Sequence, residues 1–173
     1  MSFNMGALLE PLSVALAGIR RAQLGLGQPC LIAGTGTVGL LAVALANAGG
    51  ATPIVATDIN EKRLKIAKEL GATHAINSTG KTPGQIAEEI LQATGEANRP
   101  EVAIECSGVE SSIQSTALVR CTRFVARGSP DSRIVIGTRL WWSLVTNWSV
   151  QQGTSAIPFR SYHGSRSVCL YNR

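Results

Sequence analysis

The fold is decided by the stretch Cys30-Leu-Ile-Ala-Gly34-Thr-Gly36-Thr-Val-Gly39, a short apolar run that ends in three glycines spaced G-x-G-x-x-G. An alanine-rich segment of helical character follows it as far as Asn47. A strand, a glycine turn and a helix in this order are typical of Rossmann domains, which hold a dinucleotide pyrophosphate at the turn. In this pattern Gly34 permits the tight turn, Gly36 lets the backbone approach the phosphates, and Gly39 allows the helix to pack on the strand.

An acidic residue follows at the distance that such a unit needs. A second strand-like run, Ile54-Val-Ala-Thr57, ends in Asp58, nineteen residues after Gly39. An acid in this position accepts hydrogen bonds from the adenosine ribose hydroxyls. Asp58 favours NAD over NADP because a carboxylate repels a 2′-phosphate, and the neighbouring Ile59 is not the arginine of an NADP site. A glycine turn without any ligand is the alternative that the three glycines alone leave open.

Strand-like and helical segments alternate through the middle of the chain. Asn60 and Gly71 are good boundary residues for one helix, and Thr82-Pro83 and Gly95 for the next. This alternation predicts an α/β fold, a Rossmann-type doubly wound parallel sheet with the strand order 3-2-1-4. The sheet is expected to be incomplete after the fourth strand, because the candidate strand beyond it is short. The remaining expected elements are strands at 72–77 and 101–106, a helix at 109–118 and the short candidate strand at 133–137.

The N-terminal residues predict a helix that precedes the glycine motif. Apolar residues recur with helical spacing between Ala7 and Leu24, and Arg20 and Arg21 suit the C-terminal end of a helix dipole. Glu10-Pro11 is expected in the first turn, where an acid is favoured and a proline is tolerated. On these grounds Glu10 is a helix-start acid.

Composition separates two regions of the 173-residue chain. The net charge is +5, but residues 1–119 hold eight basic and ten acidic residues, whereas residues 120–173 hold eight arginines and one acid. No apolar run is long enough for a membrane span, no secretory signal is visible, and the four cysteines show no C-x-x-C pair. These observations predict a cytoplasmic protein with no membrane partner.

Several of these residues together resemble one enzyme family. Gly6-Ala-Leu-Leu-Glu-Pro-Leu-Ser-Val14, the glycine motif, Asp58 with Arg63, and Glu105-Cys-Ser-Gly-Val-Glu-Ser-Ser-Ile113 are similar to the zinc-dependent polyol dehydrogenases. These are the sorbitol, xylitol and arabinitol dehydrogenases of the medium-chain alcohol dehydrogenase superfamily. The resemblance covers roughly residues 5–118 and implies the coenzyme-binding half of such an enzyme.

The resemblance implies a role for each matching residue. Val38 would pack beside the pyrophosphate, Asp58 would bind the adenosine ribose, and Arg63 would lie along the adenine or ribose. Glu10 would act as a catalytic acid that reaches the zinc ion or its bound water. The full-length family binds a polyol, NAD and zinc. The expected cofactor-binding residues are Gly34, Gly36, Thr37, Val38, Gly39, Asp58, Arg63 and Ser107.

Stable zinc binding is not expected in this chain. The family's main zinc ligands belong to an N-terminal domain that has no counterpart here, and neither His74 nor His163 has a cysteine at ligand spacing. The resemblance therefore predicts a lead-in helix at 1–24, an NAD-binding domain at 25–119 and an atypical tail at 120–173, inactive as an isolated piece.

Other functions remain as alternatives. A non-catalytic module could bind a dinucleotide or a partner, and it could form a homo-oligomer through the sheet edge beyond the fourth strand. Nucleic-acid binding by the arginine-rich tail, with Trp141, Trp142 and Trp148 as stacking residues, is disfavoured because the arginines are scattered. A short-chain dehydrogenase is disfavoured because no tyrosine precedes a lysine at the Y-x-x-x-K spacing.

Overall fold

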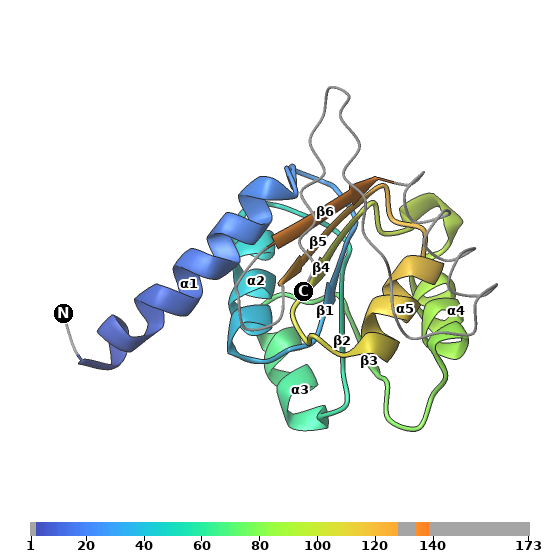
Figure 1. Ribbon diagram of the computed structural model, residues 1–173, viewed down its shortest axis with the longest axis horizontal. Coiled ribbons are helices and arrows are strands. Elements are labelled where there is room, and N and C mark those ends of the chain that lie inside the picture. Colours follow the sequence, from blue (N-terminus) through green and yellow to red (C-terminus); the bar gives the residue numbers. More distant parts are fainter. Residues whose placement is uncertain (1–2, 128–133, 139–173) are drawn as a thin grey trace, which may run out of the picture.

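The computed structural model describes residues 3–127 and 134–138, which build a three-layer arrangement around one six-stranded sheet (Figure 1). The strand order is β3-β2-β1-β4-β5-β6, so the predicted order 3-2-1-4 and the Rossmann-type fold are confirmed. Strands β1 to β5 are parallel. Their bounds are β1 Cys30–Ala33, β2 Ile54–Asp58, β3 His74–Asn77, β4 Val102–Glu105, β5 Arg123–Arg127 and β6 Ile134–Thr138.

Helices cover both faces of the sheet. Neighbouring residues of β1 point to opposite faces, so Ile32 joins one hydrophobic cluster with Val43, and Leu31 joins the other with Ile90. Helices α1, α2 and α3 lie on the first face, and α4 and α5 lie on the second (Figure 1). Their bounds are α1 Phe3–Arg21, α2 Thr37–Ala48, α3 Glu61–Glu69, α4 Pro83–Thr94 and α5 Glu110–Leu118, with a short 3-10 turn at Glu96–Asn98.

The predicted helix boundaries are confirmed by their capping contacts. The Asn60 side chain accepts hydrogen bonds from the backbone N–H groups of Lys62 and Arg63 at the start of α3. Thr82 and Gln85 exchange hydrogen bonds in a capping box at the start of α4. Each contact satisfies backbone donors that the first turn of a helix leaves without partners.

The expectation that the sheet ends after the fourth strand is wrong. β5 pairs in parallel with β4, from Val102 beside Arg123 to Glu105 beside Ala126, and β6 adds an antiparallel strand to β5. The sheet edge next to β4 is therefore covered and cannot serve as the proposed oligomer interface. Apolar periodicity does not predict β5, because only Phe124 and Val125 at its centre are large and apolar.

The candidate strand at 133–137 is confirmed at 134–138. Four other residues named from the sequence lie outside the described residues: Trp141, Trp142, Trp148 and His163.

Helix α1 begins earlier than its apolar spacing predicts. It starts at Phe3 rather than Ala7, so Pro11 lies inside the helix and its first turn contains no acid. The interpretation of Glu10 as a helix-start acid is therefore wrong. Proline cannot donate to the carbonyl four residues earlier, but Ala7 is exposed, so water can occupy that carbonyl.

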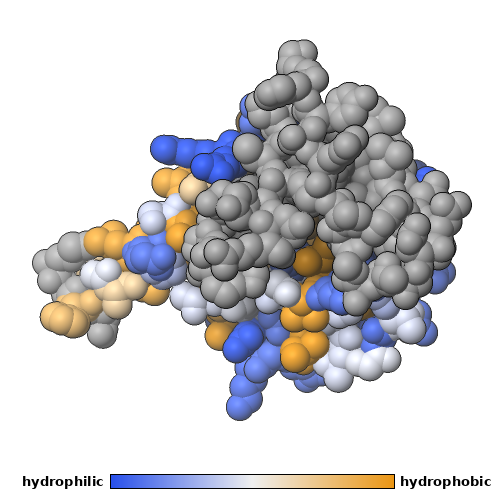
Figure 2. Space-filling view, viewed as in Figure 1, coloured by the Kyte–Doolittle hydropathy of each residue, from blue (hydrophilic) through white to orange (hydrophobic). Residues whose placement is uncertain are grey.

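The N-terminal half of α1 projects from the body of the molecule and carries exposed apolar side chains (Figures 1 and 2). Phe3 is 96% exposed, and Met5, Leu8 and Leu9 are each about half exposed. The C-terminal half instead packs on α2, with Ala15 buried, and Ala22 directly after the helix is buried as well. Among the described helices, α1 included, none is long and apolar enough to cross a membrane.

One arginine ties the C-terminal end of α1 to the sheet. The Arg123 guanidinium, at the start of β5, donates to the backbone oxygens of Ala22 at 2.9 Å and Gln23 at 2.6 Å. It also donates to the Gln28 side-chain oxygen at 2.8 Å. The carbonyls at the end of a helix have no partners within the helix, so Arg123 supplies donors where they are needed. Residues 100 positions apart are thereby joined.

We expect Arg123→Ala to lower the free energy of unfolding by about 1–3 kcal/mol, because it leaves partly buried helix-end carbonyls without a donor. Lys65→Ala is the matched control, since Lys65 is an exposed cation on α3 and its removal is expected to change stability by less than about 0.5 kcal/mol. Urea unfolding followed by circular dichroism measures both. Equal stabilities of the two variants would show that the Arg123 contacts contribute nothing.

Candidate functional site

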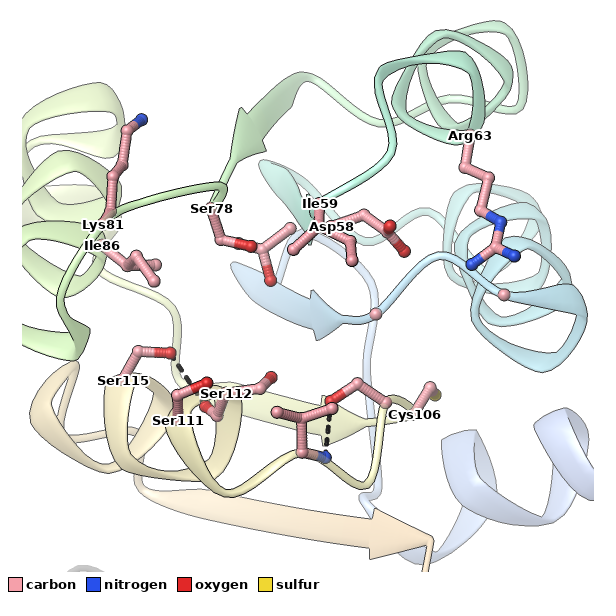
Figure 3. A pocket seen from close by; sticks show the side chains of 15 residues that line it. Asp58, Ile59, Arg63, Ser78, Lys81, Ile86, Cys106, Ser111, Ser112 and Ser115 are labelled. Carbon is pink, nitrogen blue, oxygen red and sulfur yellow. Dashed lines mark hydrogen bonds between the residues drawn. The ribbon is translucent and has the colours of Figure 1, made fainter.

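A cleft of about 290 Å³ lies at the carboxyl ends of β1, β2 and β4 (Figure 3). In an open α/β sheet this edge, where the strand order reverses, is the usual position of a ligand site. Five of the predicted site residues line it: Gly34, Gly36, Asp58, Arg63 and Ser107. The other lining residues are Thr57, Ile59, Ser78, Lys81, Ile86, Cys106, Val109, Ser111, Ser112 and Ser115.

Gly34 brings the end of β1 into contact with the loop after β4. Its backbone φ is +88°, a conformation that residues with a side chain rarely adopt. A Cβ atom at this position would lie 2.7 Å from the backbone nitrogen of Ser107. Only glycine therefore allows the two loops to approach so closely, and this approach forms the floor of the cleft.

Gly39 and Gly36 have different structural roles. A Cβ atom on Gly39 would lie 1.9 Å from the carbonyl oxygen of Gly34, so helix α2 can pack against the turn only without that atom. A Cβ atom on Gly36 would meet nothing within 4 Å, because this residue faces open space and lines the cleft. The fold therefore requires a glycine at position 39, whereas at position 36 only a ligand close to the backbone would require one.

Asp58 is the last residue of β2, and both oxygens of its carboxylate accept hydrogen bonds from the protein. Oδ2 accepts from the Thr35 backbone N–H at 2.7 Å and from the Thr35 hydroxyl at 2.9 Å. Oδ1 accepts from the Asn60 backbone N–H at 2.8 Å. The side chain is 9% exposed and lines the cleft. A carboxylate can accept about four hydrogen bonds, so one acceptor position remains for a ligand.

Two cationic side chains line the same cleft. Arg63 reaches it from the first turn of α3, and Lys81 from the loop between β3 and α4 (Figure 3). Lys81 is already paired with Glu89 at 2.5 Å. Among the residues that the structure describes, no carboxylate lies within 4.0 Å of the Arg63 guanidinium nitrogens. Arg63 thus lines the cleft with a charge that no carboxylate of the described residues neutralises.

A second buried carboxylate holds the loop after β4, whose residue Ser107 lines the cleft. Glu105, at the end of β4, is fully buried and accepts from the backbone N–H groups of Ser107 at 3.0 Å and Gly108 at 2.9 Å. It also accepts from the hydroxyl groups of Ser107 and Ser112. These contacts compensate the burial of the charge and fix the loop that carries Ser107.

Four predicted residues do not line the cleft. Thr37 and Gly39 belong to the first turn of α2, and Val38 lines a separate small cavity of about 20 Å³ between α1 and α2. Glu10 lies exposed on the projecting part of α1. Thr35 and Glu105 do not line the cleft either, but they hold Asp58 and Ser107, which do. Sequence spacing does not predict their roles, because these come from contacts in the folded chain.

The described residues do not fit a zinc ion. Within 3–127 and 134–138, no group of three or more His, Cys, Asp or Glu side chains is arranged to hold a metal. Burial raises the pKa of both the Cys30 and the Cys121 thiols to about 12, so neither is available as the thiolate that binds zinc. Glu10 alone is one exposed carboxylate. No chemical step through zinc follows from these residues.

A parallel sheet with a glycine turn, a strand-end acid and a cleft at the switch point defines the Rossmann class of α/β proteins. Residues 37–128 match the family described as "Zinc-binding dehydrogenase", and the chain belongs to this family.

The curated proteins to which this chain is similar include polyol dehydrogenases. The L-arabinitol 4-dehydrogenase of Talaromyces emersonii is 51% identical over 125 residues, which are 66% of this chain and 32% of that protein. The sorbitol dehydrogenase of Bos taurus is 43% identical over 115 residues, again 66% of this chain and 32% of that protein. The match thus spans about a third of the length of these relatives.

Solved structures agree with the fold. Galactitol-1-phosphate dehydrogenase from Escherichia coli is 28% identical with a TM-score of 0.61, over 73% of this chain and 35% of that one. A Sinorhizobium meliloti protein described as a zinc-binding dehydrogenase, solved bound to NADP, is 28% identical with a TM-score of 0.56 over 65% of this chain and 32% of that one. NAD or NADP and zinc are therefore the cofactors of the family.

We expect the two glycine substitutions to separate folding from the site. Gly39→Ala should lower the free energy of unfolding by about 3 kcal/mol or more, because its Cβ atom would collide with the Gly34 carbonyl oxygen. Gly36→Ala should change it by no more than about 1 kcal/mol, since its Cβ atom meets no protein atom. Thermal and urea unfolding of both variants checks this. Equal loss of stability would contradict the different roles of these glycines.

Proposed function

We propose that this chain is the NAD-binding domain of a zinc-dependent polyol dehydrogenase and that, as an isolated piece, it binds the dinucleotide without turning over substrate. The proposal is carried by one observation. The glycine turn and Asp58 share a single cleft, with open space in front of Gly36. Membership of the zinc-binding dehydrogenase family and the likeness to the arabinitol and sorbitol enzymes support it.

The residues of the cleft and of the helix end beside it fit the parts of NAD. The N-terminal end of α2 offers backbone N–H groups without helical partners, beginning with Thr37 and Val38, to the pyrophosphate. The free acceptor position of Asp58 takes a ribose hydroxyl, and Arg63 lies along the adenosine half. Bound NAD supplies the hydride acceptor of the reaction. The described residues bind and orient the cofactor.

Titration calorimetry with NADH and NADPH tests the proposal. NADH should bind saturably, and NADPH at least about tenfold more weakly, because a 2′-phosphate adds negative charge beside the Asp58 carboxylate. Gly36→Ala should abolish NADH binding, since its Cβ atom would occupy the space of the phosphates. Wild-type affinity in this variant, or no binding by the wild type, would overturn the proposed site.

A non-catalytic dinucleotide-binding module is the second candidate. It is favoured by the lack of a group of three or more potential metal ligands among the described residues. We expect no NADH formation when this chain is mixed with NAD, zinc and L-arabinitol, sorbitol or xylitol. The Talaromyces emersonii enzyme is the positive control. Turnover by this chain would contradict both the second candidate and the inactivity of the isolated piece.

A further inference from the structure

We infer that Thr35, the residue between the first two glycines, is the positioning residue that fixes Asp58 and thereby sets the preference for NAD over NADP. The inference rests on the proposed function, since it concerns how the same cleft distinguishes two dinucleotides. It assigns a role to a position that the G-x-G-x-x-G pattern leaves free.

The contact between Thr35 and Asp58 is short, double and buried. The backbone N–H and the hydroxyl group of Thr35 both donate to Oδ2 of Asp58, at 2.7 and 2.9 Å. Thr35 is completely buried, so its hydroxyl group has no water to donate to instead. Hydrogen bonds to a charged acceptor are stronger than neutral ones, and two from one residue also fix the direction of the carboxylate.

The occupied positions decide which ligand groups Asp58 can bind. Oδ2 has both of its lone-pair directions in use, and Oδ1 has one occupied by the Asn60 N–H at 2.8 Å. A ligand can therefore contact Asp58 well only by donating a hydrogen to the remaining position on Oδ1. A ribose hydroxyl has such a hydrogen. A 2′-phosphate dianion has none and adds negative charge to the same place.

The Thr35 hydroxyl group opposes movement of the Asp58 carboxylate. An aspartate free to turn about its Cα–Cβ bond could swing its carboxylate away from a 2′-phosphate, which would reduce the repulsion. The same rotation would weaken the hydrogen bond to a 2′-hydroxyl. A fixed carboxylate therefore favours NAD and excludes NADP more strongly than the same carboxylate without its support.

Thr35 also joins the two halves of the site. It lies within the glycine turn, between Gly34 and Gly36, and its contact with Asp58 bridges β1 and β2 where their ends separate. Because its N–H group is used by Asp58, Thr35 is not a donor to the pyrophosphate. The anion must be bound by amides further along, at the start of α2.

The test compares NADH and NADPH dissociation constants in the wild type, Thr35→Val and Thr35→Ser. Valine keeps the shape and the backbone N–H but removes the hydroxyl group, whereas serine keeps the hydroxyl group. In Thr35→Val the ratio of the NADPH to the NADH dissociation constant should fall about fivefold or more, mainly through weaker NADH binding. Thr35→Ser should keep the wild-type ratio. Thr35→Ala removes the same hydroxyl group and replaces the valine variant if that variant does not fold.

The ratio of the NADPH to the NADH dissociation constant distinguishes the possible outcomes. A merely structural role for Thr35 would weaken both dinucleotides equally and leave the ratio within twofold of the wild type, which would overturn the inference while the proposed function stands. Failure of the wild type to bind either dinucleotide would overturn the proposed function and the role of Thr35 with it. A reduced ratio in Thr35→Val, restored in Thr35→Ser, is the result that supports the inference.

Discussion

The structure depends on three backbone segments meeting where no side chain fits between them. The end of β1, the first turn of α2 and the loop after β4 converge at Gly34 and Gly39. An added Cβ atom at Gly39 would lie 1.9 Å from the Gly34 carbonyl oxygen, and one at Gly34 would lie 2.7 Å from the Ser107 nitrogen. Gly34, Gly36 and Ser107, which lie at or beside this meeting point, line the cleft. The core packing and the site are therefore products of the same steric constraint.

Two buried carboxylates then fix the loops around this meeting point. Asp58 and Glu105 end β2 and β4, the two neighbours of β1, and each accepts hydrogen bonds from the loop that follows its own strand. Burying a carboxylate costs free energy unless donors surround it, so each loop is held in the one conformation that supplies them. The two acids differ in the hydrogen-bond acceptor positions that they leave free for a ligand. Glu105 is completely buried and has a structural role, whereas Asp58 keeps one acceptor position at the cleft.

Local patterns predicted the elements that local forces determine. The helix caps at Asn60 and Thr82 are contacts between residues two or three positions apart, so their spacing is visible in the sequence. β5 was not predicted, because its stability comes from pairing with β4 and from the contacts of Arg123 with residues near 22. The start of α1 was misplaced because Pro11 reads as a first-turn residue. Thr35 and Glu105 escaped for the same reason as β5, since their partners are identified only by the folded backbone.

The distribution of the site along the chain explains what an isolated piece can retain. Every residue that lines the cleft lies between positions 34 and 115, within the alternating strands and helices that form most of both hydrophobic clusters. The cleft is therefore assembled by the same strands and helices that build most of the core. A tetrahedral zinc site has the opposite requirement, because its ligands must come together in one place, and the described residues bring no such group together. In the proposed function, cofactor binding and polyol chemistry are separable, because the described residues assemble the cleft and bring no group of metal ligands together.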